Sequence, residues 1–499
     1  MRLRISARKS DLARLQALMV GEALQAQHPH LNIEYRFKES LGDKNLTDPL
    51  WKIPEKGVFT EDFHDELMQQ ETDLVVHSWK DLPTEPKTET LIAATLPRAD
   101  QRDLLLLKKS HFAKIKNLKA LRIFSSSPRR EYNLTDFFKS HLPFALQDVR
   151  FENVRGNIPT RIRKLYESTE VDGLIVAKAA LDRLLTAPHA EFAEVQGQLR
   201  QHLSEMNWAV LPLSINPNAA AQGALAIEIL KGRADIEALV KSIHDEDTFV
   251  CAQKERDILA SFGGGCHQKI GVAVLRRPYG DITFLRGLTD QGQVLKERSL
   301  KTSAAFCCTE KNLWSEGAES ERTSLPVSPL PVDINALYIA RKEAWPEGLS
   351  YSGFIWAAGL KTWQSLAQKG IWVHGCAESL GEDEDPRIEV LAGRPLKWAK
   401  LSHDEGFVSS TMPLIATYSL KISMAMSTLQ NKDSFFWNSG SQFLCAVTNA
   451  PEILNKHHAC GPGNTAKVIR AYLEKKNVFD PAKFRLVLDQ ENWRQLCKQ

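Results

Sequence analysis

The feature that most constrains the fold is an alternation of short apolar strands and helical patterns over the first 230 residues. LRISAR (3–8) predicts a strand, and Ser10 can cap a following helix with apolar positions at Leu12, Leu15 and Leu18. Further predicted strands lie at 32–37, 74–78, 121–127, 149–154 and 173–180. This order predicts an α/β fold with largely parallel sheets in two lobes.

A different pattern begins near residue 247. Residues 247–262 predict a helix, which Gly263–Gly265 would end. After Cys266, apolar segments are split by the turn signals PYGD and TDQG. We therefore expect a small α+β third domain with an antiparallel meander.

The C-terminal part shows a linker pattern and then a weak repeat. Residues 309–333 are polar and punctuated by prolines, as in an extended linker. GFIWAAGLKTW (353–363) is similar in pattern to SFFWNSGSQFL (434–444). Residues 334–499, the second module, are therefore expected to form two α/β lobes.

Composition excludes several classes of protein. A length of 499 residues suggests roughly three domains. The net charge of +3 is too small to indicate a general nucleic-acid or membrane surface. No apolar run approaches the ~20 residues of a membrane span, and no secretory signal is present. The eight cysteines show no framework spacing, so we expect reduced thiols and a cytoplasmic protein.

Polar clusters follow several predicted strands, where open α/β sheets bind ligands. They are Arg8 with Ser10, HSWKD at 77–81, SSSPRR at 125–130, RGNIPTR at 155–161, and Arg183. Arginine forks bind carboxylates or phosphates, so the ligand should be strongly anionic. Among these cations, the Asp81 carboxylate could stabilise positive charge in a transition state; alternatively it could be a helix cap or a structural ion pair.

Seven motifs carry a resemblance to a known family. They are RKSDLARLQ (8–16), KGVF (56–59), VHSWKDLP (76–83), SSSPRR (125–130), VRGNIPTR (154–161), AQGALAIE (221–228) and GGC (264–266). In this order, over about residues 1–305, the chain resembles hydroxymethylbilane synthases, also called porphobilinogen deaminases. The fold of that family implies two lobes like those of periplasmic binding proteins, followed by the small third domain.

The resemblance implies a covalent cofactor and a reaction. Cys266 would carry a dipyrromethane through a thioether, as a primer to which four porphobilinogen units are added head to tail with loss of ammonia. Hydrolysis would then release a linear tetrapyrrole. Asp81 would stabilise the azafulvene cation formed as ammonia leaves, and the partners would be porphobilinogen and polycarboxylate pyrrole intermediates.

The resemblance also assigns roles to other residues. Lys80, Ser127, Arg129, Arg130 and Arg161 match cofactor-binding positions. Arg8, Ser10, Arg155 and Arg183 match substrate-binding positions, and Lys52, Lys56 and Phe59 match a lid over the cleft.

Four positions depart from the family pattern. Gly263 replaces a common glutamate, Lys269 a proline, Ala221 a glycine and Ser125 a threonine. None of these changes removes a charged group on which the chemistry depends. The sequence offers no account of His267 and Lys269.

The second module resembles uroporphyrinogen-III synthases, which close the linear tetrapyrrole with inversion of one ring. Tyr418, in ATYSL, matches a tyrosine suspected of assisting loss of a hydroxyl group; Ser439 and Thr465 lie in glycine-bearing turns. An inactive or scaffolding module remains the alternative. We expect no metal site, because alternation in a strand places His457 and His458 on opposite faces.

The expected domains are lobe 1 (1–98 and 206–228), lobe 2 (99–205), a cofactor-carrying domain (229–308), a linker (309–333) and the second module (334–499). We expect a monomer that binds neither nucleic acid nor membranes. The rival interpretations are a periplasmic-type anion-binding protein, which would need no cysteine in a glycine-rich turn, and a nucleic-acid-binding protein, for which no motif is present.

Overall fold

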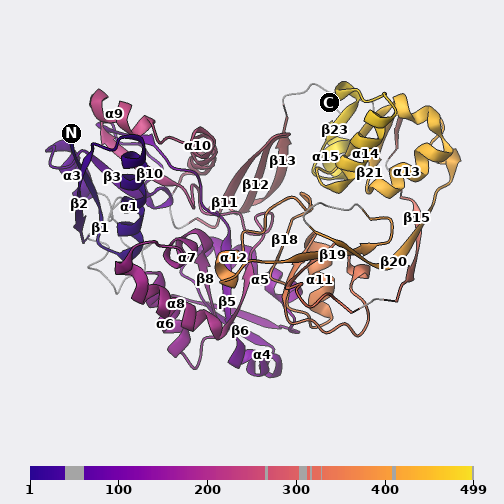
Figure 1. Ribbon diagram of the computed structural model, residues 1–499, viewed down its shortest axis with the longest axis horizontal. Coiled ribbons are helices and arrows are strands. Elements are labelled where there is room, and N and C mark those ends of the chain that lie inside the picture. The colour runs from indigo at the N-terminus through magenta and orange to yellow at the C-terminus, as the bar shows by residue number, and fades with distance from the viewer. Residues whose placement is uncertain are drawn as a thin grey trace. The chain divides into compact units, whose positions relative to one another are not determined.

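The structure is a computed structural model that describes residues 1–496 apart from 40–60, 265–267, 303–311, 315–316, 327–328 and 407–411. The chain divides into two compact units, which are described separately. The first unit, here called the first module, holds most of residues 1–297. The second unit holds most of residues 298–499 and contains the second module (Figure 1). Within the described ranges, no helix is long and apolar enough to cross a membrane.

Lobe 1 is built on a five-stranded sheet in the order β2-β1-β3-β10-β4. Its strands are β1 (Arg2–Arg8), β2 (Asn32–Lys38), β3 (Leu74–Ser78), β4 (Thr90–Ala94) and β10 (Leu225–Leu230), and its helices are α1 (Asp11–Gln27), α3 (Glu61–Met68) and α9 (Ala234–Lys241). β1 runs parallel to β2 and β3, whereas β10 is antiparallel to β3 and β4. The predicted α/β class is confirmed.

Lobe 2 repeats this arrangement with the order β7-β6-β8-β5-β9. Its strands are β5 (Asp103–Lys108), β6 (Ala120–Phe124), β7 (Asp148–Glu152), β8 (Gly173–Ala177) and β9 (Met206–Val210), and its helices are α4 (Phe112–Leu118), α5 (Pro128–His141), α6 (Ile158–Glu167), α7 (Lys178–Leu185) and α8 (Ala193–Ser204). β6 is parallel to β7 and β8, whereas β5 is antiparallel to β8 and β9. In each lobe, therefore, one strand runs antiparallel to both of its neighbours: β10 in lobe 1 and β5 in lobe 2.

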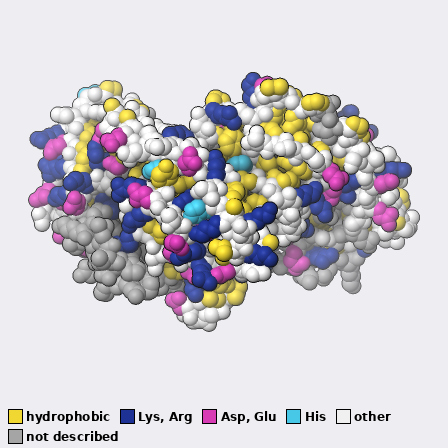
Figure 2. Space-filling view, turned by 90° about the horizontal axis from the view of Figure 1, so that it is seen from below, with side chains coloured by type: hydrophobic (Ala, Val, Ile, Leu, Met, Phe, Trp, Pro, Cys, Tyr) yellow, Lys and Arg dark blue, Asp and Glu magenta, His cyan; other side chains and the backbone are white. Residues whose placement is uncertain are grey.

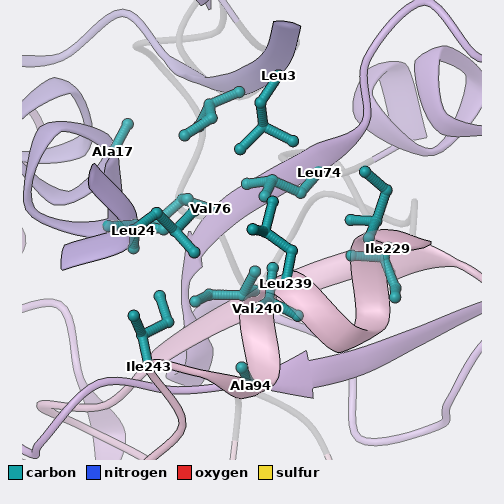
Figure 3. Packing of buried hydrophobic residues seen from close by; sticks show 14 of the residues in the cluster. Leu3, Ala17, Leu24, Leu74, Val76, Ala94, Ile229, Leu239, Val240 and Ile243 are labelled. Atoms are coloured by element: carbon teal, nitrogen blue, oxygen red, sulfur yellow. The ribbon is translucent and has the colours of Figure 1, made fainter. Parts of the chain in front are cut away.

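Two of the expected domain boundaries are wrong. β9 pairs with β5, so residues 206–210 belong to lobe 2, and the chain returns to lobe 1 only after Val210. Residues 229–243 belong to the core of lobe 1, because Leu239, Val240 and Ile243 join the cluster that contains Leu74 and Val76 (Figure 3). The third domain starts near Asp245, where the Asp245 side chain caps a new helix by accepting a hydrogen bond from the Thr248 amide.

The third domain contains that helix, α10 (Glu246–Ser261), and a sheet of β11 (Gly271–Arg277), β12 (Gly280–Leu288) and β13 (Val294–Lys301), in sequence order. Glu255 of α10 is fully buried and fastens this domain to the chain segment between the lobes. Its carboxylate accepts hydrogen bonds from both terminal nitrogens of Arg98, at 2.9 and 2.7 Å, and from the backbone amides of Ala221 and Val274, both at 2.8 Å.

The second module contains two sheets, as its internal repeat predicts. One has six strands in the order β15-β20-β19-β16-β17-β18, and the other has four in the order β14-β21-β22-β23. The strands are β14 (Leu313–Trp314), β15 (Glu319–Ser324), β16 (Ala336–Ile339), β17 (Phe354–Ala357), β18 (Gly375–Cys376), β19 (Trp398–His403), β20 (Leu414–Ser423), β21 (Ser434–Trp437), β22 (His457–Cys460) and β23 (Phe484–Leu486). The helices are α11 (Leu360–Gln368), α12 (Glu389–Ala392), α13 (Gly440–Asn449), α14 (Asn464–Lys475) and α15 (Gln490–Leu496).

The expectation of a linker over 309–333 is wrong for two segments. β14 pairs in parallel with β21, and β15 pairs antiparallel with β20. The physical reason is that backbone pairing does not require an apolar sequence: β15 (ESERTS) is polar and mostly exposed, and its hydrogen bonds come from the β20 ladder. The second module therefore begins by residue 313.

Candidate active site

The strand-end clusters lie where the sheets of the first module end. In lobe 1, β1 ends at Arg8 and Ser10 precedes α1, while the short helix η2 (Trp79–Asp81) directly follows the parallel strand β3. In lobe 2, Ser127 follows β6 and Arg155 follows β7, also parallel neighbours. Because parallel strands end at one edge, each lobe gathers its predicted site residues at a single edge of its sheet.

A buried carboxylate organises the basic residues of lobe 2. Asp103, at the start of β5, has no exposed surface. It accepts hydrogen bonds from Arg129 (Nη2, 2.8 Å), Arg130 (Nε, 3.0 Å; Nη2, 2.7 Å), Asn216 (Nδ2, 2.8 Å) and Gln222 (Nε2, 2.9 Å). Burial alone would raise the pKa of Asp103, but the charges of Arg130 and Arg129 hold it far below the usual range.

Arg129 and Arg130 are themselves buried and largely bonded to the protein. Nη1 of Arg129 donates to Oδ1 of Asn216 at 2.9 Å and to the Pro217 carbonyl at 2.6 Å, and Nη1 of Arg130 donates to the Ile175 carbonyl at 3.0 Å. These bonds fix both guanidinium groups before any ligand arrives. Cofactor contact by these two arginines stays a prediction.

Lys80 links this cluster to Asp81. Its ammonium group donates to Oε1 of Gln222 at 3.2 Å, and Gln222 in turn donates to Asp103. Removal from water lowers the pKa of Lys80, the Asp81 carboxylate opposes this effect, and Arg130 adds to it. The Asp81 side chain is exposed to solvent, so it is accessible to a ligand.

Arg161 shows that positive charge exceeds negative charge around Asp81. Its Nε donates to the Gly156 carbonyl at 2.7 Å. Burial, together with the charges of Arg130 and Arg155, lowers the pKa of Arg161 to about 10, and Asp81 only partly opposes this. Cations that depress one another's pKa would be stabilised by an added anion. The residues present therefore fit a cofactor that carries carboxylates.

Arg183 lies beside the segment in which the chain returns from lobe 2 to lobe 1. It is buried in α7 and donates from Nη2 to the Gly223 carbonyl at 2.7 Å. Burial lowers the pKa of Arg183 to about 10. Its Nε has no hydrogen-bond partner among the described residues, so it retains a donor for a ligand.

Four predicted residues lie outside the described residues: Cys266 and the lid residues Lys52, Lys56 and Phe59. The residues that flank Cys266 are nevertheless informative. Gly264 has φ +65°, and a Cβ there would collide with the Thr84 side chain, three residues after Asp81. A Cβ at Gly271 would meet Cδ of Arg129 at 3.0 Å. Both flanks of the predicted attachment site thus lie close to segments that carry site residues.

The predicted residues of the second module lie on three elements. Tyr418 is buried in β20. Ser439 caps α13, its hydroxyl accepting a hydrogen bond from the Gln442 amide at 3.2 Å, and Thr465 lies in the first turn of α14. Because β21 and β22 are parallel neighbours, Ser439 and Thr465 follow strands that end at the same edge. In β22, the buried His458 accepts a hydrogen bond from the Trp437 indole at 3.0 Å.

Sequence reasoning missed Asp103, Asn216 and Gln222 as organisers of the basic cluster. One signal was available, since Asp103 opens an otherwise apolar strand, DLLLLK. A charged residue in a buried strand normally has a buried partner. By contrast, His77 of the HSWKD motif does not bond to the basic cluster but to Glu228: its Nε2 lies 2.8 Å from Oε2 of that residue.

The charge on the face shown in Figure 2 is mixed. Lys and Arg side chains there are interspersed with Asp and Glu rather than gathered into one continuous basic surface. The excess of positive charge near Asp81 is therefore a local feature, as the small net charge of the chain predicts.

Comparisons with known proteins identify relatives of the first module. Residues 3–238 match the profile described as "Porphobilinogen deaminase, dipyromethane cofactor binding domain". The chain is 36% identical over 287 residues to the porphobilinogen deaminase of Syntrophomonas wolfei, covering 57% of this chain and 84% of the relative. It is 32% identical over 333 residues to that of Lawsonia intracellularis, covering 65% and 98%.

A third relative, the porphobilinogen deaminase of Dictyostelium discoideum, is 33% identical over 273 residues, covering 54% of this chain and 76% of that protein. Solved structures resemble the chain only weakly. YhfZ from Shigella flexneri, for example, covers 52% of this chain and 90% of its own at 13% identity and a TM-score of 0.25.

Proposed function

The chain belongs to the porphobilinogen deaminase family, and we propose that it joins four porphobilinogen units head to tail on a dipyrromethane attached to Cys266. Each addition forms one carbon–carbon bond and releases one ammonia, and hydrolysis then frees the linear tetrapyrrole. When bound, the dipyrromethane supplies the pyrrole carbon to which the first unit is joined. The observation that carries this proposal is the exposed Asp81 carboxylate beside the charged groups of Lys80 and Arg161.

Asp81 is the residue that we assign to charge stabilisation. Loss of ammonia leaves positive charge on the substrate pyrrole, and an ionised carboxylate beside it lowers the energy of that state. Lys80 and Arg161 place positive charge next to Asp81.

The surrounding cations hold the carboxylates of the pyrroles. Each unit that is added brings an acetate and a propionate, so negative charge grows with every step. A hydrogen bond to a charged group contributes about 1.5–3 kcal/mol. Arg155, Arg161 and Arg183 are the arginines that we assign to this task, with Arg8 and Ser10 from lobe 1.

Intact-protein mass spectrometry tests the attachment site. Active protein should be heavier than the mass of its sequence by one dipyrromethane, and the adduct should be absent from Cys266→Ser. Cys251→Ser is the matched control, because Cys251 is a buried thiol of α10 in the same domain, and it should keep the adduct. An unmodified mass in active protein, or an adduct on Cys266→Ser, would contradict the proposal.

A second activity is favoured by the architecture of the second module. The chain passes between its two sheets from β14 into β15 and from β20 into β21, and the buried Tyr418 lies in β20. We propose that this module closes the linear tetrapyrrole to uroporphyrinogen III, with Tyr418 assisting loss of the hydroxyl group. An inactive, scaffolding module is the alternative.

Product analysis separates these two alternatives. The purified full chain, supplied with porphobilinogen and no other enzyme, should yield the type III isomer, and Tyr418→Phe should shift the product toward type I. Only type I product from the unmodified chain would mean that the second module is inactive, while leaving the deaminase proposal intact.

A further inference from the structure

A fully buried lysine in lobe 2 has no part in the site described so far. Lys178 is the first residue of α7, and its side chain has no exposed surface. Lysine is almost never fully buried unless it is paired. Positive charge in the first turn of a helix is also unfavourable, because the helix dipole already places partial positive charge there. Neither burial nor helix formation therefore explains why a lysine stands at this position.

Two carboxylates compensate the charge of Lys178. Its ammonium group lies 3.4 Å from Oδ2 of Asp100 and donates a hydrogen bond to Oδ2 of Asp182, one turn further along α7. Asp100 is fixed in turn by Arg102, whose Nε and Nη2 donate to it at 2.9 and 2.6 Å. These four residues, here called the α7 network, carry two positive and two negative charges.

Asp182 depends on Lys178 for its negative charge. Burial raises the pKa of Asp182 to about 6, and Lys178 is the cation that opposes this rise most strongly. Asp100 adds to the rise and Arg102 opposes it, while Arg200 of α8 is a further cation that interacts with Asp182. Oδ1 of Asp182 is buried without a hydrogen-bond partner among the described residues. The pair is therefore a buried unit rather than an ordinary ion pair on a helix surface.

The α7 network stands where two parts of the candidate site meet. β5 and β8 pair so that Asp103 lies opposite Ala177, the residue directly before Lys178. The Lys178 amide also donates to the Arg102 carbonyl at 3.0 Å. The network therefore joins the start of β5, which carries Asp103, to the start of α7, the helix that carries Arg183.

A second connection between these parts runs through Gly223. Its carbonyl accepts hydrogen bonds from Nη2 of Arg183 at 2.7 Å and from the Ala99 amide at 3.2 Å. Gln222, the preceding residue, donates to Oδ1 of Asp103 at 2.9 Å. Arg183 and Asp103 are thus held against one short segment, so their spacing depends on how α7 is fixed to the residues before β5.

We propose that Lys178 and Asp182 are positioning residues for substrate binding: they hold α7 against residues 100–103, and so place Arg183 to bind a carboxylate of porphobilinogen. This inference rests on the role proposed above for Arg183. Lys178 and Asp182 act through the backbone of α7, and neither is assigned a contact with the substrate. An exposed ion pair of the same spacing would contribute little; the burial of this one and its third contact, to Asp100, give it a larger effect.

Steady-state kinetics with a charge-balanced double variant tests the proposal. Lys178→Met with Asp182→Asn removes one charge of each sign and leaves the pair of Asp100 and Arg102 intact, so the full chain should still fold. The KM for porphobilinogen should rise about fivefold while kcat stays within about twofold, because carboxylate binding is lost equally from the ground state and the transition state. Should the double variant fail to fold, Asp182→Asn alone is the more conservative variant, with the same expected direction.

Arg163→Met with Glu167→Gln is the matched control. These two residues form an exposed pair of the same spacing on α6 of the same lobe, so both kinetic constants should stay unchanged.

Chemical modification of Arg183 gives a readout that needs no turnover. Arg183 is 8% exposed, so phenylglyoxal, a reagent selective for arginine, should modify it slowly in the unmodified chain. In the double variant, peptide mass spectrometry should show modification about threefold faster or more, because α7 is less firmly held. The control pair should leave the rate unchanged.

Three results would overturn the proposal. One is an unchanged KM in a folded double variant, which would make the α7 network purely structural. Another is an unchanged rate of Arg183 modification, and the third is a fall in kcat with no change in KM. If the unmodified chain made no tetrapyrrole from porphobilinogen, the proposed function would fail, and the modification rate of Arg183 would then decide the positioning role by itself.

Discussion

Asp103 in the first module and Tyr418 in the second are both buried polar residues, but their surroundings differ. Asp103 accepts five hydrogen bonds from four side chains, two of them arginines. The Tyr418 hydroxyl makes no well-formed hydrogen bond to the described residues, and Arg322 is near enough for a weak one at most. Asp103 thus holds the neighbouring cations in place, whereas the Tyr418 hydroxyl is left largely for something else to satisfy.

This difference predicts how strongly a substitution at each site should change stability as well as binding. Where the protein itself completes the hydrogen bonds, a substitution should cost folding free energy as well as activity. Where it does not, a substitution should affect binding with little cost in stability. The predictions below test that contrast.

The largest effect should come from Asp103→Asn. The substitution leaves Arg129 and Arg130 buried without their counter-charge, and breaking a buried ion pair costs about 3–5 kcal/mol. Urea unfolding should show a loss of this size at pH 7. Because the folded-state pKa of Asp103 is depressed, its contribution is present above about pH 4 and declines as the pH falls below that value. The difference between the two proteins should therefore shrink in acid.

Asp148→Asn is the control for that experiment. Asp148 pairs with Arg150 on the exposed surface of the same lobe, so its loss should cost less than about 1 kcal/mol. A loss for Asp103→Asn no greater than that of the control would mean that the buried cluster does not hold the arginines in place.

Asp81→Ala should separate activity from stability within the first module. The side chain is exposed, so unfolding should change little, whereas loss of its charge should reduce kcat about 100-fold or more. Steady-state kinetics with porphobilinogen measures this effect. Asp65→Ala, an exposed aspartate of α3, should keep full activity. Substantial turnover in Asp81→Ala would falsify its catalytic role.

Ala221→Gly tests for backbone strain at the segment where the chain crosses between the two lobes of the first module. Ala221 has φ +64°, a left-handed conformation that disfavours a side chain, next to Gln222 of the basic cluster. Glycine should raise the free energy of unfolding by about 0.5–1 kcal/mol. Ala219 does not have a positive φ, so Ala219→Gly should lower the free energy of unfolding. If both substitutions changed the free energy of unfolding in the same direction, Ala221 would not be strained.

Tyr418→Phe should have the smallest effect on stability. Its hydroxyl makes no well-formed hydrogen bond to the described residues, so thermal or urea unfolding should change by less than about 0.5 kcal/mol. Tyr351 is the comparison in the same lobe, because its hydroxyl donates to the Ile334 carbonyl at 3.3 Å, and Tyr351→Phe should cost about 1 kcal/mol. A larger cost for Tyr418→Phe would show that the protein does satisfy this hydroxyl.

The sequence predicted most of the β/α order but not the partners across strands. Strands such as β1 and β3 were predicted because their periodicity and apolar runs are local features. The assignment of β9 to lobe 2 depends on pairing with β5, about 100 residues earlier, and no local pattern reveals that.

The sequence likewise predicted only some residues of the candidate site. Lys80, Asp81, Arg155 and Arg161 were found because they stand at strand ends in recognisable motifs. Asp103 and Lys178 were not, because each acts through neighbours that are distant in sequence. Predicting them requires the strand register, which composition and spacing do not contain.

The short strand β14 has a consequence for how the second module is synthesised. Leu313 and Trp314 emerge from the ribosome first but pair with β21, whose residues are made about 120 positions later. Trp314 is buried against Phe435 and Trp437, so its packing partners do not exist until most of the module has been translated. Cotranslational folding can thus complete the lobe of β16 to β20 first, while the four-stranded sheet forms only near the end of synthesis.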